Sequence, residues 1–358
     1  MKVLTFVGGY TQGSEAGLRI FESDAETGDF RFLDKIPETK NAIFFALNRA
    51  GTRLYTGQGD PAYGPDSSNG IVAAYAVSGR RVARLNARPI GVTPPCYVAL
   101  DPEEGHLAFA EYTHAVAGVF ALAPDGSLAG EGPLVRIRHH GAGPNLPRQD
   151  RAHAHCAVVS PEGKYLCVVD LGIDRVKVYD YAACRRGEVK GLPAMSFGNA
   201  PGAGPRHLLF HPNRKLAFVI HELGNTMTSY RYTGEGFFPV QTVPLLPGGF
   251  ADATKASAIK LSADGTQIFC SNRGHDSIAA FALDPASGRL SLMAISRLAG
   301  AFPRDFTFMP GERFALVGHE RSNTLMTYAY DRKTGVFTPS GPAYEMHRPV
   351  VIAFGNAL

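Results

Sequence analysis

Short apolar strands separated by turns of Pro, Asp and Gly recur along the whole chain. The segment 156–170, CAVVSPEGKYLCVVD, shows the pattern: an apolar strand, a turn, and a second strand that ends in a polar residue. A third apolar strand follows after a short loop, as in RVKVYDY at 175–181. The same unit returns about every 50 residues, and its five further copies cover 46–59, 99–112, 209–222, 260–273 and 307–320.

A fourth strand often completes the unit, as RLSLMAI at 289–295 does after the turn DPASG. Units of four short strands at this spacing are typical of the blades of a β-propeller. The chain ends supply a seventh blade, because 348–355 is a first strand without a successor, whereas 2–10 and 17–24 are second and third strands without a predecessor. Pairing the two termini in one sheet would close the ring and remove its exposed edges.

We therefore predict an all-β fold, namely a seven-bladed β-propeller with four antiparallel strands per blade, whose last blade is closed by the N- and C-terminal strands. Residues 1–358 are expected to form a single propeller domain. A linear solenoid of stacked repeats is the structural alternative, and the split repeat at the termini disfavours it.

Composition and charge exclude several classes of protein. Apolar residues make up 45% of the chain and charged residues 19%, which is ordinary for a folded soluble domain. The net charge of +4 is not concentrated in a basic run, and no apolar stretch reaches the roughly 18 residues of a membrane span. We therefore expect neither a nucleic-acid nor a membrane partner. Five cysteines without a CxxC pair, and an N-terminus without a signal-peptide pattern, favour a cytoplasmic protein with reduced thiols.

Equivalent positions of the repeat should form rings around the central channel, because the first strand of each blade lines that channel. The column six residues before each turn is strongly cationic and comprises Cys96, His155, Arg206, Ser257, Arg304 and Arg348. The residue pairs that end the second strands are mostly polar: Gln58/Gly59, Glu111/Tyr112, Asp170/Leu171, His221/Glu222, Asn272/Arg273 and His319/Glu320. We expect both columns to meet at one mouth of the channel.

Two interpretations of these columns compete. Polar residues at strand ends can serve only to satisfy backbone groups, and Asp170, Asn272 and Ser257 are of types that often do so. Arginines gathered around one aperture, however, would repel one another unless glutamates or an anionic ligand compensate their charge. A pocket for a small-molecule carboxylate or phosphate accounts for the whole cluster.

Other chemistries have weaker support in the sequence. His153 and His155, two residues apart on a strand, would face the same side and could ligate zinc, but no further metal-type motif accompanies them, so we expect no metal. Phosphate-loop and dinucleotide fingerprints are absent, so we expect no cofactor, and the GxSxG pattern of serine hydrolases does not occur. Strand alternation predicts that His207 points away from Arg206.

Three long segments resemble the seven-bladed lactonase family, which includes the propeller-type 6-phosphogluconolactonases and the fungal carboxy-cis,cis-muconate cyclases. They are HAHCAVVSPEGKYLCVVDLGIDRVKVYDY, GPRHLLFHPNRKLAFVIHELGNTMTSYRY and SNRGHDSIAAFALDPASGRLSL. The N-terminal FVGGYTQ and the loop GAGPNLPRQDRAHAH are also similar to that family, so the resemblance covers nearly the whole chain. It implies that the catalytic residues are His155, Arg206, Glu222 and Arg273. The sequence departs from many members by the His221/Glu222 pair, which it repeats as His319/Glu320.

The leading hypothesis is a metal-independent lactonase that hydrolyses an anionic sugar lactone, either 6-phosphogluconolactone or a sugar-acid lactone. Glu222 or His155 would be the base, while Arg206 and Arg273 would hold the substrate anion and stabilise the oxyanion. Further substrate contacts are predicted at His153, His221, Asn272, Arg304, His319 and Glu320.

Two other functions remain open. A cycloisomerase that forms a lactone from a muconate could use the same arginines. A non-catalytic propeller that serves as a binding scaffold is the third possibility, although the chain has no Trp and therefore no WD dipeptide.

Overall fold

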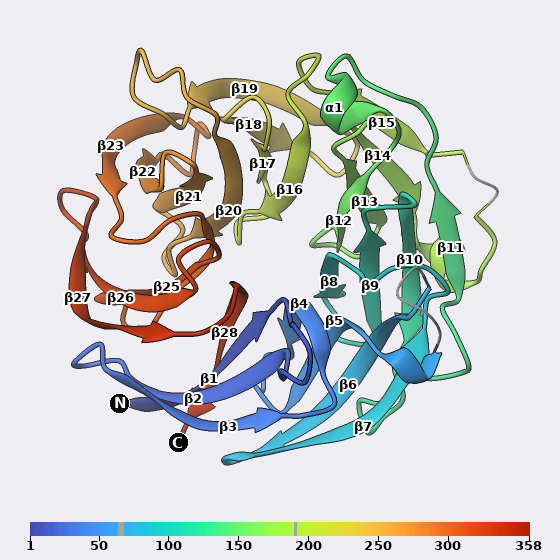
Figure 1. Cartoon of the computed structure of the whole chain (residues 1–358). Helices are drawn as coiled ribbons and strands as arrows, with labels where there is room; N and C mark the ends of the chain where they lie inside the picture. Colours follow the sequence, from blue (N-terminus) through green and yellow to red (C-terminus); the bar gives the residue numbers. More distant parts are fainter. Residues whose placement is uncertain (64–67, 190–191) are drawn as a thin grey trace.

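The structure is a computed structural model that describes residues 1–63, 68–189 and 192–358. Its strands form seven sheets of four antiparallel strands arranged in a ring (Figure 1). This arrangement confirms the predicted seven-bladed propeller. Blade 1 contains β28 (Pro349–Ala357), β1 (Lys2–Gly9), β2 (Leu18–Asp24) and β3 (Phe30–Ile36), and blade 2 contains β4 (Lys40–Leu47), β5 (Arg53–Gly59), β6 (Gly70–Ser78) and β7 (Arg81–Pro89).

The remaining five blades follow one another along the chain. Blade 3 contains β8 (Tyr97–Leu100), β9 (His106–Glu111), β10 (Val116–Ala121) and β11 (Val135–Arg138). Blade 4 contains β12 (Ala154–Val159), β13 (Tyr165–Asp170), β14 (Arg175–Asp180) and β15 (Met195–Gly198). Blade 5 contains β16 (Pro205–Phe210), β17 (Leu216–His221), β18 (Thr226–Tyr232) and β19 (Phe237–Pro244). Blade 6 contains β20 (Lys255–Leu261), β21 (Gln267–Arg273), β22 (Ser277–Leu283) and β23 (Leu290–Arg297). Blade 7 contains β24 (Pro303–Phe308), β25 (Phe314–His319), β26 (Thr324–Asp331) and β27 (Val336–Glu345).

The two ends of the chain close the ring in blade 1, as predicted. Strand β28 pairs with β1 in antiparallel register, with Val7 opposite Ile352 and Gly8 opposite Val351. Both termini therefore lie at the same blade (Figure 1). Because the first and last strands of the chain pair within one sheet, the row of blades closes into a ring.

Most buried apolar side chains pack between neighbouring blades. Phe218 of β17, for example, lies in one buried cluster with Ile268 and Phe281 of blade 6. The second strands are buried on both faces, so their side chains fill the space between two sheets. Phe and Tyr provide the largest buried side chains of a protein without Trp.

A β-bulge interrupts the start of several first strands. The pairing register shifts between Ala154 and Cys156, between Pro205 and His207, and between Pro303 and Asp305. The extra residues at these bulges are His155, Arg206 and Arg304. A bulge bends the strand and redirects a side chain, and here it directs these three side chains toward the mouth of the channel.

The same bulge makes the prediction for His207 wrong. Its ring nitrogen Nε2 lies 3.0 Å from Arg206 Nη1, so the two side chains do not point apart. The ring also lies 5.0 Å from that of Tyr97 and 5.3 Å from that of His155, on the first strands of other blades. Strict alternation fails because the bulge inserts one unpaired residue, and both Arg206 and His207 therefore face the channel.

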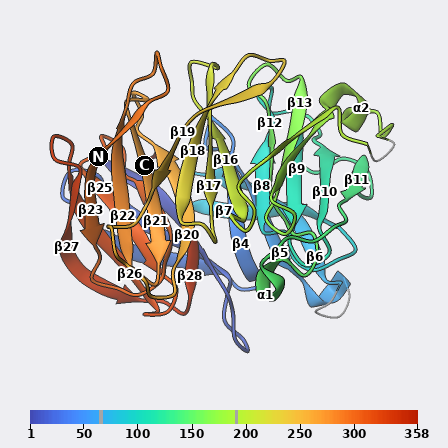
Figure 2. The ribbon, with the colours of Figure 1, turned by 90° about the horizontal axis from the view of Figure 1, so that it is seen from above.

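Helices are few and short in the described parts of the chain: α1 (Leu146–Gln149), α2 (Tyr181–Arg185) and the 3₁₀ turn η1 (Pro61–Tyr63). Helix α1 belongs to the long connection between β11 and β12 and projects from one face of the ring (Figure 2). None of these helices has the length and apolar character needed to cross a membrane.

Candidate active site

A cavity of about 360 Å³ opens at one mouth of the central channel. All seven blades, or the loops that leave them, contribute to its wall, so residues far apart in the sequence meet there. The lining residues are Tyr10, Asn41, Ile43, Thr93, Pro94, Cys96, Tyr112, Thr113, Arg148, His155, Glu222, Arg273 and Arg304. A cavity of this size is at the lower end of the range for small-molecule sites.

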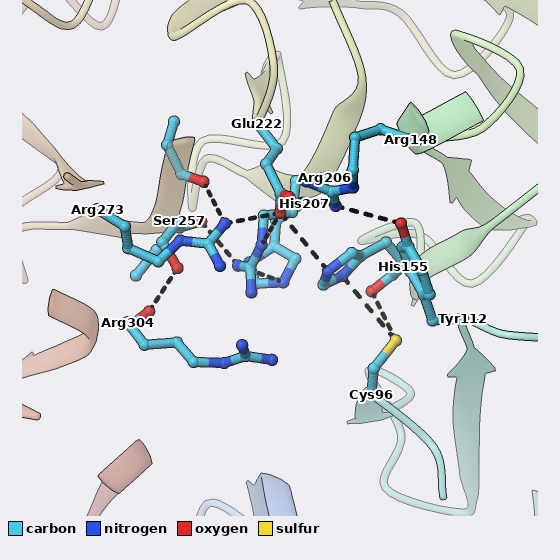
Figure 3. A network of polar contacts seen from close by, with 12 residues as sticks. Cys96, Tyr112, Arg148, His155, Arg206, His207, Glu222, Ser257, Arg273 and Arg304 are labelled. Carbon is cyan, nitrogen blue, oxygen red and sulfur yellow. Dashed lines mark hydrogen bonds and ion pairs between the residues drawn. The ribbon is translucent and has the colours of Figure 1, made fainter. Parts of the chain in front are cut away.

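The carboxylate of Glu222 is the centre of a buried charge cluster (Figure 3). Its Oε2 lies 3.1 Å from Arg206 Nε and 2.7 Å from Arg273 Nη2. Its Oε1 lies 2.7 Å from Arg148 Nη2. One carboxylate thus binds three guanidinium groups, which leaves the cluster with a net positive charge.

Arg206 and Arg273 are held from behind by backbone carbonyls. Arg206 Nη1 donates to Ser257 O at 2.8 Å, and Arg273 Nη2 donates to Ala256 O at 2.9 Å. Both arginine residues are no more than 5% exposed. The guanidinium groups are therefore fixed before any ligand arrives, as electrostatic catalysis requires.

His155 lies beside this cluster. Its Nε2 is 4.0 Å from Glu222 Oε2, and its Nδ1 is 3.9 Å from Cys96 Sγ. The ring also meets Tyr112 edge to face at 5.5 Å between centroids. A proton taken up by this imidazole would lie next to the Glu222 carboxylate, which would stabilise the resulting cation.

A second ion cluster lies at the junction of blades 7 and 1. Glu320 binds Arg304 at 3.2 Å through Oε2 and Arg348 at 2.5 Å through Oε1. Both guanidinium groups lie over the ring of Tyr10, at 5.3 Å and 4.4 Å from its centroid. Arg304 and Tyr10 line the cavity, so this cluster and the Glu222 cluster face the same space.

The family model described as "Lactonase, 7-bladed beta-propeller" matches residues 4–354. The chain belongs to the seven-bladed lactonase family. It is 34% identical over 357 residues to the 6-phosphogluconolactonase of Bacillus subtilis, covering 99% of this chain and 98% of the relative. The periplasmic gluconolactonase of Pseudomonas aeruginosa superimposes with a TM-score of 0.91 at 29% identity, covering 100% of both chains. A protein from Lactobacillus plantarum superimposes with a TM-score of 0.88 at 29% identity, covering 99% of this chain and 100% of the other.

In this lactonase-family site, burial and neighbouring charges shift several pKa values. Burial alone would raise the pKa of Glu222, but Arg273, Arg206, His155 and Arg148 hold it well below its usual 4.5. Burial and the Arg206 charge hold the pKa of His155 well below 6.5. Glu222 is therefore ionised and His155 neutral at neutral pH.

The arginines show the effect of their crowding. Burial, followed by repulsion from Arg273, lowers the pKa of Arg206 to about 9. The pKa of Arg273 is also lowered, first by burial, although Glu222 opposes the shift. In both cases the charge of Glu222 opposes the downward shift, so the carboxylate stabilises the charged guanidinium groups.

Four of the residues predicted for this site lie in the cavity wall, and a fifth is buried and binds one of them. His155, Glu222, Arg273 and Arg304 line the cavity, whereas Arg206 is buried behind Glu222. Glu320 is not in the wall but binds Arg304, which is.

The other predicted substrate contacts bond to groups away from the cavity wall. His221 Nε2 lies 2.8 Å from Asn199 Oδ1, His319 Nε2 lies 3.1 Å from the Tyr328 hydroxyl, and Asn272 Nδ2 donates to Leu245 O at 2.9 Å. The reason is the strand period. Successive residues at the end of a second strand face opposite sides, so Glu222, Arg273 and Glu320 turn toward the channel mouth and their predecessors turn into the blade.

His153 supports the wall without lining it. Its ring stacks on Tyr112 at 4.2 Å between centroids, and its Nδ1 donates to the Tyr112 carbonyl at 2.9 Å. Within the described residues, no group of three or more His, Cys, Asp or Glu side chains is arranged to hold a metal ion.

The sequence columns did not identify Arg148, which binds Glu222 and also donates to the Tyr112 hydroxyl at 3.2 Å. Arg148 comes from α1, in a connection that no other blade repeats. The only signal for it in the sequence was its place in the loop GAGPNLPRQDRAHAH, just before the two histidines.

Proposed function

We propose that this protein hydrolyses an anionic sugar lactone to the open-chain acid. The observation that carries this proposal is the Glu222 cluster, in which one carboxylate binds three guanidinium groups next to a neutral imidazole inside a small cavity. The names of two relatives support hydrolysis of a sugar lactone, since one is a 6-phosphogluconolactonase and the other a gluconolactonase.

Ester hydrolysis of a lactone needs positive charge near the carbonyl oxygen. When water attacks the carbonyl carbon, the oxygen becomes an oxyanion, and fixed N–H donors in a dry site stabilise that charge most effectively. Arg273 and Arg148 line the cavity and are already oriented by Glu222, so they are the proposed donors. Arg206 does not line the cavity, and its Nε helps to hold the Glu222 carboxylate by donating to Oε2 at 3.1 Å.

His155 is the proposed general base. Both oxygens of Glu222 already accept from arginines, and its low pKa makes it a poor proton acceptor. His155 is neutral and lines the cavity, and its Nε2 is 4.0 Å from Glu222 Oε2. It would take a proton from the attacking water and later return it to the ring oxygen that leaves, so that the ring C–O bond breaks as an alcohol forms.

The direct test measures acid release from 6-phosphogluconolactone and from aldarolactones by the wild type and by two variants. Arg273→Ala is expected to lower kcat/KM by about 100-fold or more, the size of effect seen when one oxyanion donor is lost. Glu222→Gln should lower kcat/KM by a similar factor, because its carboxylate orients both proposed donors. Retained activity in both variants would contradict the proposal. Consumption of a carboxymuconate without lactone hydrolysis would point to a lactone-forming enzyme instead.

Glu22→Gln is the matched control. Glu22 is also a buried glutamate bound by three cations, Lys2, Arg31 and Arg80, but it lies in blade 1 outside the cavity. This variant should lose a comparable ion network and keep its lactonase activity. Thermal melting of all three variants separates a loss of chemistry from a loss of fold.

A further inference from the structure

The cluster around Glu320 repeats the plan of the Glu222 cluster at another place on the rim. In both, a glutamate that ends a second strand binds the arginine of its own first-strand bulge, Arg206 for Glu222 and Arg304 for Glu320. Arg348, which precedes β28 of blade 1, completes the Glu320 cluster, whereas Arg273 of blade 6 and Arg148 of α1 complete the Glu222 cluster. The Glu320 cluster is the more open of the two, since the side chain of Arg348 is 46% exposed.

Much of the hydrogen-bonding capacity of this second cluster is unused. Each oxygen of Glu320 accepts from one guanidinium, through Arg304 Nη1 and Arg348 Nη2. The remaining side-chain nitrogens of Arg304 and Arg348 have no acceptor among residues 1–63, 68–189 and 192–358. Two cations share one carboxylate, so the cluster has an excess positive charge and free N–H donors beside the cavity.

The Glu320 cluster and the proposed base His155 lie on different sides of the cavity. Arg304 stands across the cavity from His155 and Cys96 (Figure 3). Arg304 belongs to blade 7, whereas His155 belongs to blade 4 and Cys96 directly precedes β8 of blade 3, on the other side of the ring (Figure 1). A ligand whose carbonyl lies near His155 and Arg148 would therefore extend its other end toward Arg304 and Tyr10.

The inner arginines are already bound to Glu222, and Arg273 is also a proposed donor to the oxyanion. Arg206 does not line the cavity, and its Nε and Nη1 already donate to Glu222 and Ser257. Arg273 Nη2 is shared between Glu222 and Ala256 O. A substrate anion that bound there would also compete with the oxyanion for the same donors.

We propose that Arg304 and Arg348, positioned by Glu320 and Tyr10, form a separate subsite for an anionic group at the end of the substrate remote from the lactone carbonyl. This inference rests on the proposed lactonase function. Phosphate monoesters and carboxylates share the chemistry required, because a guanidinium can donate two parallel hydrogen bonds to either. The subsite would make the enzyme prefer charged lactones over neutral ones of the same ring.

The test uses three lactones of one six-carbon sugar that carry a hydroxyl, a carboxylate or a phosphate at carbon 6. For Arg348→Gln, kcat/KM should fall by about 10- to 100-fold for the charged lactones that the wild type hydrolyses, which is the effect of losing a charged hydrogen bond. The neutral lactone should change by less than about twofold. Comparison of the two charged lactones in the wild type shows whether phosphate or carboxylate is the preferred group.

Arg321→Gln is the matched control, because Arg321 is also an exposed arginine that stacks on an aromatic ring, Phe302, at 3.9 Å. It binds no carboxylate within the described residues, and its loss should affect all three lactones alike and weakly. Arg348→Lys, which keeps the charge but not the paired donors, should retain part of the preference. An equal effect of Arg348→Gln on all three lactones, or no effect on any, would overturn the subsite.

Failure of the proposed function would give a different result. If the wild type hydrolyses none of the three lactones, the corresponding open-chain acids are measured by calorimetry against the wild type and Arg348→Gln. Tighter binding of the phosphorylated or dicarboxylic acid than of the neutral-ended acid, lost in Arg348→Gln, would still support the subsite. Equal binding of all three acids by the wild type would overturn it.

Discussion

His155 owes its proposed role to its surroundings rather than to its residue type. Burial and the positive charge of Arg206 both disfavour the imidazolium, so the pKa of His155 lies well below 6.5. Glu222, 4.0 Å away, opposes this shift but does not reverse it. The imidazole is consequently in its basic form over the whole neutral range, and only stronger acid removes it.

This pKa predicts the pH dependence of lactone hydrolysis. After subtraction of the spontaneous reaction, kcat/KM should stay constant from about pH 8 to below the ordinary histidine pKa of about 6.5 and should fall only in more acidic buffer. Arg206→Gln removes a cation that depresses the pKa, so its acid limb should move to higher pH even though its rate is lower. A wild-type acid limb at pH 6.5 or above would contradict the assignment of His155.

Single residues also show where sequence reasoning reaches its limit. The repeat columns found His155, Arg206, Glu222, Arg273 and Arg304 because equivalent positions of a closed ring must meet. The columns could not tell which member of each strand-end pair faces the channel, because alternation along a strand fixes only that the two members point to opposite sides.

At the scale of elements, α1 and its flanking loop hold Arg148 over the cavity. Gln149, which is fully buried, anchors this loop by donating from Nε2 to Leu171 O and to Asp174 Oδ1, each at 2.8 Å. Its Oε1 accepts from the backbone of Asn145 at 3.1 Å. Because this connection occurs once in the chain, periodicity contained no information about it, and Arg148 could not be predicted from the repeat.

The anchoring of α1 can be tested with a double-mutant cycle. Gln149→Ala should lower kcat by about 10-fold, because loosening the loop misplaces Arg148, while Arg148→Ala should lower it at least as much. If Gln149 acts through Arg148, Gln149→Ala should have almost no further effect on kcat in the Arg148→Ala background. Additive effects of the two changes on kcat would show that the two residues act independently, and thermal melting controls for a general loss of stability.

At the scale of the whole molecule, the ring could be predicted because every blade has to meet the same packing requirement. Each blade must bury two faces, so apolar strands return at a fixed spacing, and the incomplete units at 2–24 and 348–355 can only complete each other. The ion network of Glu22 with Arg80 of blade 2 and with Lys2 and Arg31 of blade 1 joins the closing blade to its neighbour. Such lateral contacts depend on individual side-chain conformations and were not visible in the pattern.

The closed ring also buries five histidines whose pKa values are lowered, namely His155, His207, His221, His275 and His319, and this makes its stability depend on pH. Burial lowers the pKa of His221 and of His319 to about 4, and burial together with Arg206 holds those of His155 and His207 well below 6.5. As the pH falls below about 6.5, these histidines become protonated in the unfolded chain but stay neutral in the folded protein. Each such histidine then lowers the free energy of unfolding by up to about 1.4 kcal/mol for each unit by which the pH falls.

Stability should therefore be complete above pH 6.5 and decline between pH 6.5 and about 4, before most carboxylates titrate. Calorimetry at pH 7.5 and 5 is expected to show a marked drop in Tm for the wild type. His221→Gln should reduce that drop because one titrating group is lost, whereas His140→Gln, which changes an exposed histidine, should leave it unchanged. A wild-type Tm that is equal at both pH values would contradict this prediction. It would show that burial of these histidines does not disfavour their protonation.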